Sequence, residues 1–176
     1  MTLQSSFDSR NTGTVFWWLL TLAWAVQIFF LSTSGFSSYR TESLLLQVLA
    51  SCQVYISPET LDLIHITMRK LSHGMLFAVL SLLVYRALGG QWLSWRTSTA
   101  RRAIAAAALY GMADEFHQLF VPDRGASLFD CGVDTAGAAL AMLLLYAFSA
   151  LRRKRGVRMG GNAEIEPVLR PSPERY

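Results

Sequence analysis

The chain has 176 residues, enough for one domain, and hydrophobic residues make up 52% of it. Charged residues make up only 16%, against about 25% in an ordinary soluble domain. This apolar content excludes disorder for most of the chain, and two cysteines are too few for a disulfide-rich secreted scaffold. A net charge of +4 and a pI of about 9.4 would suit nucleic-acid binding. The apolar content favours a membrane instead, so no nucleic-acid partner is predicted.

Two long uncharged segments, one near each end of the chain, predict membrane-spanning helices. Residues 14–31 are apolar apart from two Thr and one Gln, and a span of about 14–33 can cross a hydrocarbon core of about 30 Å. A cleaved signal peptide is disfavoured because this segment is too long and Trp-rich, with no A-x-A site behind it. Near the other end, residues 135–151 are uncharged. Together with the residues before them, they predict a span of about 129–151.

Two weaker spans are predicted between these, at about 70–88 and 103–121. The first is uncharged from Leu71 to Tyr85. The second begins apolar and then carries Asp114, Glu115, His117 and Gln118, so its second half should face the bundle interior, where ionisable residues are tolerated and usually functional. The alternative is a two-span protein with a soluble middle. The favoured fold class is all-α: a polytopic membrane protein with a four-transmembrane-helix bundle at 14–151.

The distribution of basic residues predicts the orientation in the membrane. All but four of the 16 Lys and Arg residues fall on the side that holds both termini and the loop after residue 88. The four exceptions are Arg40, Arg69, Lys70 and Arg124. Because basic residues favour the cytoplasmic side, both termini are predicted to be cytoplasmic, with an N-tail at 1–13 and a basic, disordered tail at 152–176.

Local signals mark elements on the outer side. Residues 43–50 (SLLLQVLA) are apolar enough for a short interfacial helix between spans one and two. The run 57–59 (Ser-Pro-Glu) reads as a helix N-cap with Pro at the first position, so span two should begin as a helix outside the bilayer. Residues 122–125 (Pro-Asp-Arg-Gly) indicate a turn. Ser127 and Asp130 then form a capping-box pattern at the start of span four.

Polar residues on spans two, three and four fall at one depth and on facing helical stripes. A carboxylate in lipid without a partner is costly, so these groups should face one another. They predict an outward-facing polar cavity, with Arg124 bridging the carboxylates. The chain has no HExxH or paired-Cys spacing, so no metal and no cofactor is predicted. The candidate ligand-binding residues are Lys70, His73, Asp114, Glu115, His117, Gln118, Arg124, Asp130 and Asp134.

Three pieces of sequence carry a resemblance to a known family. They are 30–34 (FLSTS), 69–73 (RKLSH) and 114–125 (DEFHQLFVPDRG), the last followed by Asp130 and Gly137. Over about 14–150 the chain resembles the VanZ-like family of small integral membrane proteins, which is known from glycopeptide-resistance clusters and is widespread in bacteria. Two residues depart from the family pattern, since Phe77 stands where the family usually has Tyr and Asp134 where it usually has Asn.

The resemblance implies a multi-pass protein of the bacterial inner membrane that belongs to the cell envelope and is linked to antibiotic resistance. The expected partner is membrane lipid, or a lipid-linked precursor or glycopeptide antibiotic, bound as an anionic or amphipathic ligand in the polar cavity. One alternative is an enzyme acting on a lipid-linked substrate by carboxylate and His acid–base chemistry, which no nucleophile motif supports. The other is a purely structural polar layer that holds three helices in register.

Overall fold

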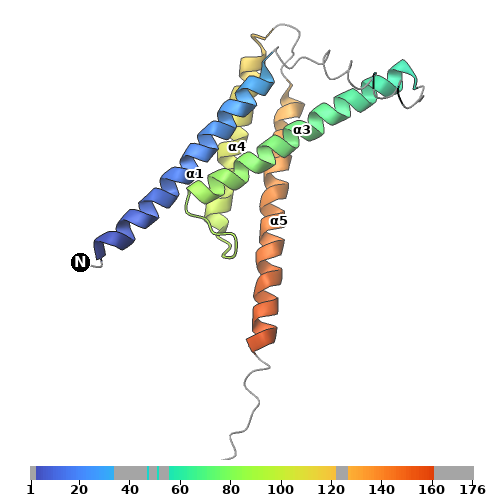
Figure 1. Cartoon of the computed structure of the whole chain (residues 1–176). Helices are drawn as coiled ribbons and strands as arrows, with labels where there is room; N and C mark the ends of the chain where they lie inside the picture. The colour runs from blue at the N-terminus through green and yellow to red at the C-terminus, as the bar shows by residue number, and fades with distance from the viewer. Residues whose placement is uncertain (1–2, 34–46, 48–50, 52–55, 122–126, 161–176) are drawn as a thin grey trace, which may run out of the picture.

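The structure, a computed structural model, describes residues 3–33, 47, 51, 56–121 and 127–160 (Figure 1). The described part is all-helical, with α1 at Leu3–Ser32, α3 at Pro58–Ala87, α4 at Thr97–Gln118 and α5 at Leu128–Gly160. It contains no β-sheet, and one isolated bridge joins Gln91 to Ser94. The predicted all-α fold class is therefore confirmed.

Within the described residues, three helices are long and apolar enough to cross a membrane: α1 over Gly13–Ser32, α3 over Pro58–Ala87 and α5 over Leu128–Arg155. Helix α4 does not meet this criterion, because it carries Arg101 and Arg102 near its start and Asp114 and Glu115 near its end. The prediction of a four-span bundle is thus confirmed in part. The protein is all-helical, and three of its helices in the described residues are apolar enough to span a membrane. The interfacial helix predicted at 43–50 falls almost entirely outside the described residues.

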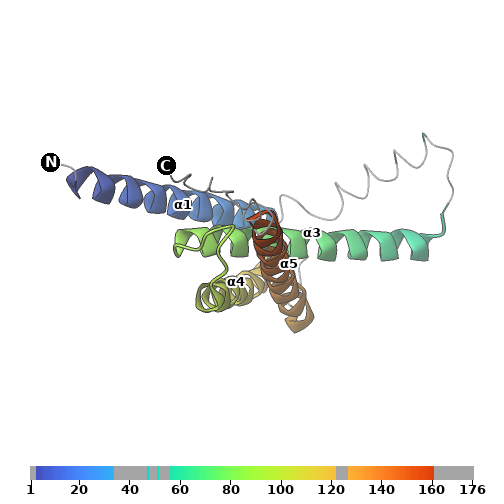
Figure 2. The ribbon, with the colours of Figure 1, turned by 90° about the horizontal axis from the view of Figure 1, so that it is seen from below.

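The helices converge at one end of the molecule. Figure 1 shows the C-terminal ends of α1 and α4 meeting the N-terminal end of α5, while α3 runs obliquely across them. In both views the first turns of α3 extend away from the other helices (Figures 1 and 2). Hydrogen bonds attach α1 to the other helices: Trp24 Nε1 donates to the Leu76 carbonyl at 2.9 Å, Tyr110 donates to the Ala25 carbonyl at 2.6 Å, and Ser32 donates to Asp114 at 2.7 Å.

The predicted start of α3 is confirmed. Ser57 is the N-cap, its Oγ accepts from the Thr60 amide at 3.3 Å, and Pro58 is the first helical residue. The helix then runs unbroken to Ala87, so it begins well before the span predicted at 70–88. The chain leaves α3 through Gly89, whose φ of 81° lies in the left-handed region that favours glycine.

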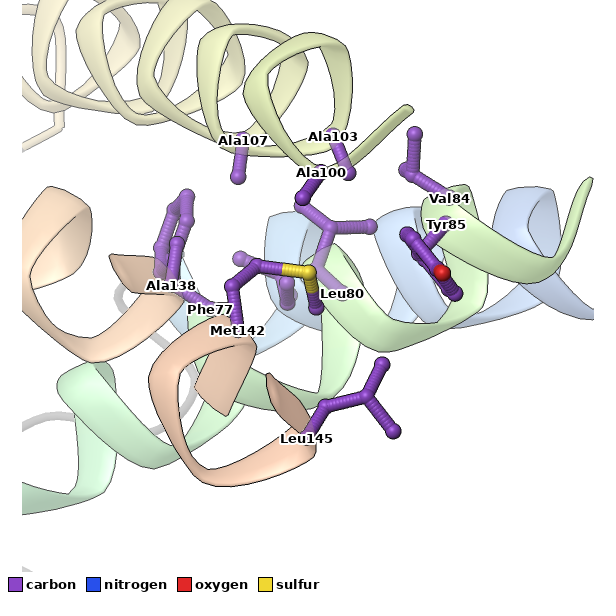
Figure 3. Close-up of a cluster of buried hydrophobic side chains, with 11 residues drawn as sticks. Phe77, Leu80, Val84, Tyr85, Ala100, Ala103, Ala107, Ala138, Met142 and Leu145 are labelled. Carbon is purple, nitrogen blue, oxygen red and sulfur yellow. The ribbon is translucent and has the colours of Figure 1, made fainter. Parts of the chain in front are cut away.

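The hydrophobic core lies where α3, α4 and α5 pack together (Figure 3). Small side chains on one face of α4 let the larger side chains of α3 and α5 pack against it. Many large apolar side chains on α1 and α5 remain exposed, as suits helices surrounded by lipid. The core residues labelled in Figure 3 are Phe77, Leu80, Val84, Tyr85, Ala100, Ala103, Ala107, Ala138, Met142 and Leu145.

Two helices extend into the segments predicted to be tails. Helix α1 begins at Leu3, inside the segment 1–13, and α5 continues to Gly160, beyond the boundary predicted at Leu151. The helix of α5 therefore includes the basic run 152–155. Residues 161–176 of the predicted C-terminal tail lie outside the described residues.

Candidate functional site

The candidate residues gather at the end of the molecule where α1, α4 and α5 converge. Five of the nine are buried: Asp114, Glu115, Gln118, Asp130 and Asp134. Arg124 lies outside the described residues, so its predicted bridge between carboxylates stays a prediction. Most of the other candidates contact one another or a neighbouring polar residue. We call these candidates and their contact partners the polar cluster, which consists of Ser32, Arg69, Lys70, His73, Asp114, Glu115, Gln118, Ser127, Asp130 and Asp134.

Asp130 links α5 to α3. Its carboxylate bonds Lys70 Nζ through Oδ1 and Arg69 Nη2, at 3.4 Å, through Oδ2. The carboxylate is 13% exposed, whereas the side chains of Lys70 and Arg69 are 29% and 43% exposed. Two partly exposed cations thus share one carboxylate at the accessible edge of the polar cluster, while the other carboxylates lie on its buried side. Lys70 Nζ also lies 4.6 Å from the centroid of the Phe129 ring.

Asp134 lies deeper on the same face of α5. Its side chain is fully buried, and neither carboxylate oxygen has a hydrogen-bond partner. A basic group of α3 lies close to it, since His73 Nδ1 is 3.7 Å from Asp134 Oδ1. Gly111 of α4 makes room for this carboxylate, because a Cβ there would stand 3.3 Å from Asp134 Oδ2 and from Phe77 Cε1.

Asp114 links α4 to α1. Its Oδ2 accepts from Ser32 Oγ at 2.7 Å and from Gln118 Nε2 at 3.0 Å, while its Oδ1 has no hydrogen-bond partner. Ser32 is fully buried but was not predicted as a site residue. Its position in the 30–34 piece of the family resemblance was the available signal. Arg69 was missed as well, although it directly precedes Lys70 in the second piece.

Glu115 corrects the predicted capping box at the start of α5. Ser127 does cap this helix, since its Oγ accepts from the Phe129 amide at 3.2 Å. The Ser127 amide, however, donates at 2.7 Å to Glu115 Oε2 of α4, not to Asp130. The reason is that the Asp130 carboxylate is turned toward Arg69 and Lys70 of α3, with which it forms ion pairs.

His117 does not join the polar cluster. Its ring lies 4.5 Å, centroid to centroid, from the ring of Phe29 on α1. Its Nδ1 is buried without a hydrogen-bond partner. The i, i+3 spacing predicted that His117 shares a helix face with Asp114. At the position of His117, however, this face of α4 packs against Phe29 of α1.

The predicted polar cavity is nearly closed. The space among Arg69, Lys70, His73, Glu115, Gln118 and Asp130 has a volume of about 10 Å³, room for no more than a water molecule. A far larger cavity of about 950 Å³ runs between α3 and α5 and meets the polar cluster at Lys70. No group of three His, Cys, Asp or Glu side chains in the described part of the chain is placed to hold a metal ion.

The comparison with protein families agrees with this geometry. The model of the VanZ/LLP1 family matches residues 16–149, which include every member of the polar cluster. The chain belongs to the VanZ/LLP1 family. Neither the curated proteins nor the solved structures provide a match. The family resemblance predicted from the three sequence pieces is therefore confirmed, and it identifies a VanZ-like membrane protein.

Proposed function

We propose that this VanZ-like protein binds an anionic, amphipathic component of the cell envelope at the exposed edge of its polar cluster. The supporting observation is the pair of partly exposed cations, Arg69 and Lys70, that share the single carboxylate of Asp130. A guanidinium has five N–H donors and an ammonium three, so both cations can bond a phosphate or carboxylate head in addition to Asp130. Chemically suitable ligands are an anionic lipid headgroup, a lipid-linked precursor or a glycopeptide antibiotic, and the last of these would connect the protein with resistance.

The interior of the polar cluster has a second, structural role in this proposal. Asp114 is bonded to Ser32, and Glu115 to the Ser127 amide, so these pairs connect α4 to α1 and to α5. A cavity of about 10 Å³ leaves no space for a ligand among them. Acid–base catalysis on a lipid-linked substrate is disfavoured because the space of about 10 Å³ gives a substrate no room to reach the buried carboxylates.

We further propose that α4 is the fourth membrane span of a bacterial inner-membrane protein with both termini in the cytoplasm. Helix α4 has 22 residues and is therefore about 33 Å long, enough to cross the hydrocarbon core. At the end opposite the polar cluster, the Arg86 guanidinium lies 4.7 Å from the Trp17 ring and 5.2 Å from the Trp92 ring. Tryptophan and arginine together are typical of a membrane interface.

The topology is tested with reporter fusions. Fusions after residues 95 and 160 should report a cytoplasmic location, and a fusion after residue 50 should report an outer location, because the basic residues bias the chain in this sense. Alkaline phosphatase and green fluorescent protein serve as the opposite reporters. An outer location at residue 160 would contradict a four-span topology.

The binding function is tested with Lys70→Gln. We expect the full-length protein in detergent micelles to bind fluorescent phosphatidylglycerol in preference to phosphatidylcholine. Lys70→Gln should weaken this binding roughly fivefold, since one basic residue near anionic lipid contributes about 1 kcal/mol. Lys154→Gln is the comparison variant: it removes one of the four basic residues in the run 152–155 at the far end of α5, and the loss caused by Lys70→Gln must exceed the loss that it causes. Equal affinities of wild type and Lys70→Gln for the anionic lipid would refute the proposed site.

A further inference from the structure

A second open cavity, of about 560 Å³, lies between α1 and α3. It shares no lining residue with the larger cavity at α5 or with the polar cluster. Among the described residues that line it, none is charged, and Gln27 supplies the one side-chain amide. We call this cavity the α1–α3 groove. Its α1 side consists of Leu20, Ala23, Trp24, Gln27 and Leu31, and its α3 side of three aliphatic residues between Leu76 and Leu83.

Gln27 is a polar residue in the middle of an apolar helix. It belongs to the part of α1 that is long and apolar enough to cross a membrane, and its side chain is exposed. Thr21, another polar residue of this stretch, is satisfied within its own helix, because its hydroxyl donates to the Trp17 carbonyl at 2.8 Å. The side-chain amide of Gln27 has no hydrogen-bond partner in the described part of the chain.

The position of Gln27 along α1 keeps its amide away from the lipid headgroups. The Ala25 carbonyl, two residues earlier, accepts from Tyr110 Oη at 2.6 Å. Tyr110 lies roughly 12 Å from the end of α4 by the helical rise, so Gln27 is at a level well inside the hydrocarbon core. An amide that bonds nothing is costly there, because no water replaces the missing hydrogen bonds.

A second copy of this chain supplies the missing partner. An amide carries both a hydrogen-bond donor and an acceptor, so two Gln27 side chains can bond each other reciprocally where a residue meets itself across a twofold axis. Two copies inserted alike bring their Gln27 residues to the same depth, whereas a different protein would need a polar group placed at that depth. The uncharged lining of the groove opposes no second copy by repulsion.

The surroundings of Gln27 suit the approach of another helix. Leu20, Ala23, Gln27 and Leu31 follow one another at spacings of three and four residues, which puts them on one stripe of α1. Ala23 is exposed one turn before Gln27, and a small side chain lets two helices come close in a membrane. The bond from Trp24 Nε1 to the Leu76 carbonyl, at 2.9 Å, fixes the stripe beside α3.

We infer that the α1–α3 groove is a self-association surface on which a second copy of this chain packs. The Gln27 amides of the two copies bond each other at its centre, and the apolar residues on either side of them exclude lipid. Because the groove shares no residue with the polar cluster, this inference does not depend on the proposed anion-binding function.

The inference is tested by Förster energy transfer between donor-labelled and acceptor-labelled copies of the full-length protein in phosphatidylcholine vesicles. Wild type should show transfer that rises with the density of protein in the membrane. Gln27→Leu should need about tenfold more protein per lipid for half-maximal transfer, the effect expected when hydrogen bonds between helices are lost. Thr21→Val is the matched control and should associate like wild type, because the Thr21 hydroxyl bonds within α1.

Disulfide cross-linking keeps Gln27 in place and so guards against misfolding of that variant. With Cys52 and Cys131 replaced by Ser, oxidation of Ala23→Cys in membranes should give a linked dimer. Leu22→Cys is the matched control and should give little dimer, because Leu22 is 61% exposed but lies outside the groove.

Three results would each overturn the inference. The first is equal energy transfer at every protein density in wild type and Gln27→Leu, and the second is equal cross-linking of Ala23→Cys and Leu22→Cys. The third is a cross-link from Ala23→Cys to a different membrane protein in place of a dimer, because the groove would then hold a partner other than a second copy.

Discussion

Gly137→Ala should destabilise the protein by about 1–3 kcal/mol, the usual cost of overpacking a close contact. A Cβ on Gly137 would overlap the Gly74 carbonyl and stand 2.7 Å from its carbon atom. These are backbone atoms of a facing helix, so relief requires α3 and α5 to move apart. That movement would disturb the core and the ion pair between Lys70 and Asp130. The thermal unfolding midpoint of the detergent-purified protein, followed by circular dichroism, measures the effect.

Gly132→Ala is the matched control and should act in the opposite direction. Gly132 lies on the same helix, and an added Cβ would meet nothing within 4 Å. Alanine is more favourable than glycine in a helix interior by about 0.8–1.0 kcal/mol, so this variant should unfold at a higher temperature than wild type. If both substitutions stabilised the protein alike, the close approach of α3 and α5 at Gly137 would be wrong.

The helices could be predicted where a long uncharged segment of sequence marks them. The apolar runs near both ends of the chain predicted α1 and α5, and the Ser57 cap predicted the start of α3. Helix α4 was harder, because Asp114 and Glu115 replace the apolar residues that mark a span. Such residues are tolerated when they face other helices, and only a view of the neighbouring helices shows that both are buried.

The helical periodicity predicted which polar residues share a face of a helix. It did not predict which of these side chains bond one another. Spacing placed Lys70 with His73, and Asp130 with Asp134, on shared stripes, and the structure brings these stripes together. Sequence could not show that Asp130 would pair with α3 and leave the Ser127 amide to Glu115. Which partners bond depends on the distances between helices, and the periodicity of a sequence gives no information about these distances. The same holds for the cavity: polar residues that pair with one another close the space that their clustering appeared to predict.

Asp134→Asn should stabilise the protein by about 1–3 kcal/mol, because a carboxylate buried without a hydrogen-bond partner costs more than a neutral amide at the same site. Asp134 is fully buried, and neither of its oxygens accepts a hydrogen bond. Three further carboxylates belong to the same cluster, so an amide removes a negative charge from an already acidic surrounding. Asparagine also has nearly the same shape as aspartate, and the VanZ-like pattern usually has it at this position.

Two neighbouring substitutions make the comparison specific. Asp114→Asn should change the stability by less than about 1 kcal/mol, because the amide oxygen can still accept from Ser32 and Gln118. Asp130→Asn should destabilise by about 0.5–1 kcal/mol, since it weakens an ion pair whose cations are partly exposed. All three are compared by their unfolding midpoints in the same detergent. Any loss of stability in Asp134→Asn would contradict this account. The contact of Asp134 with His73 at 3.7 Å would then be an ion pair that outweighs the cost of burying the carboxylate.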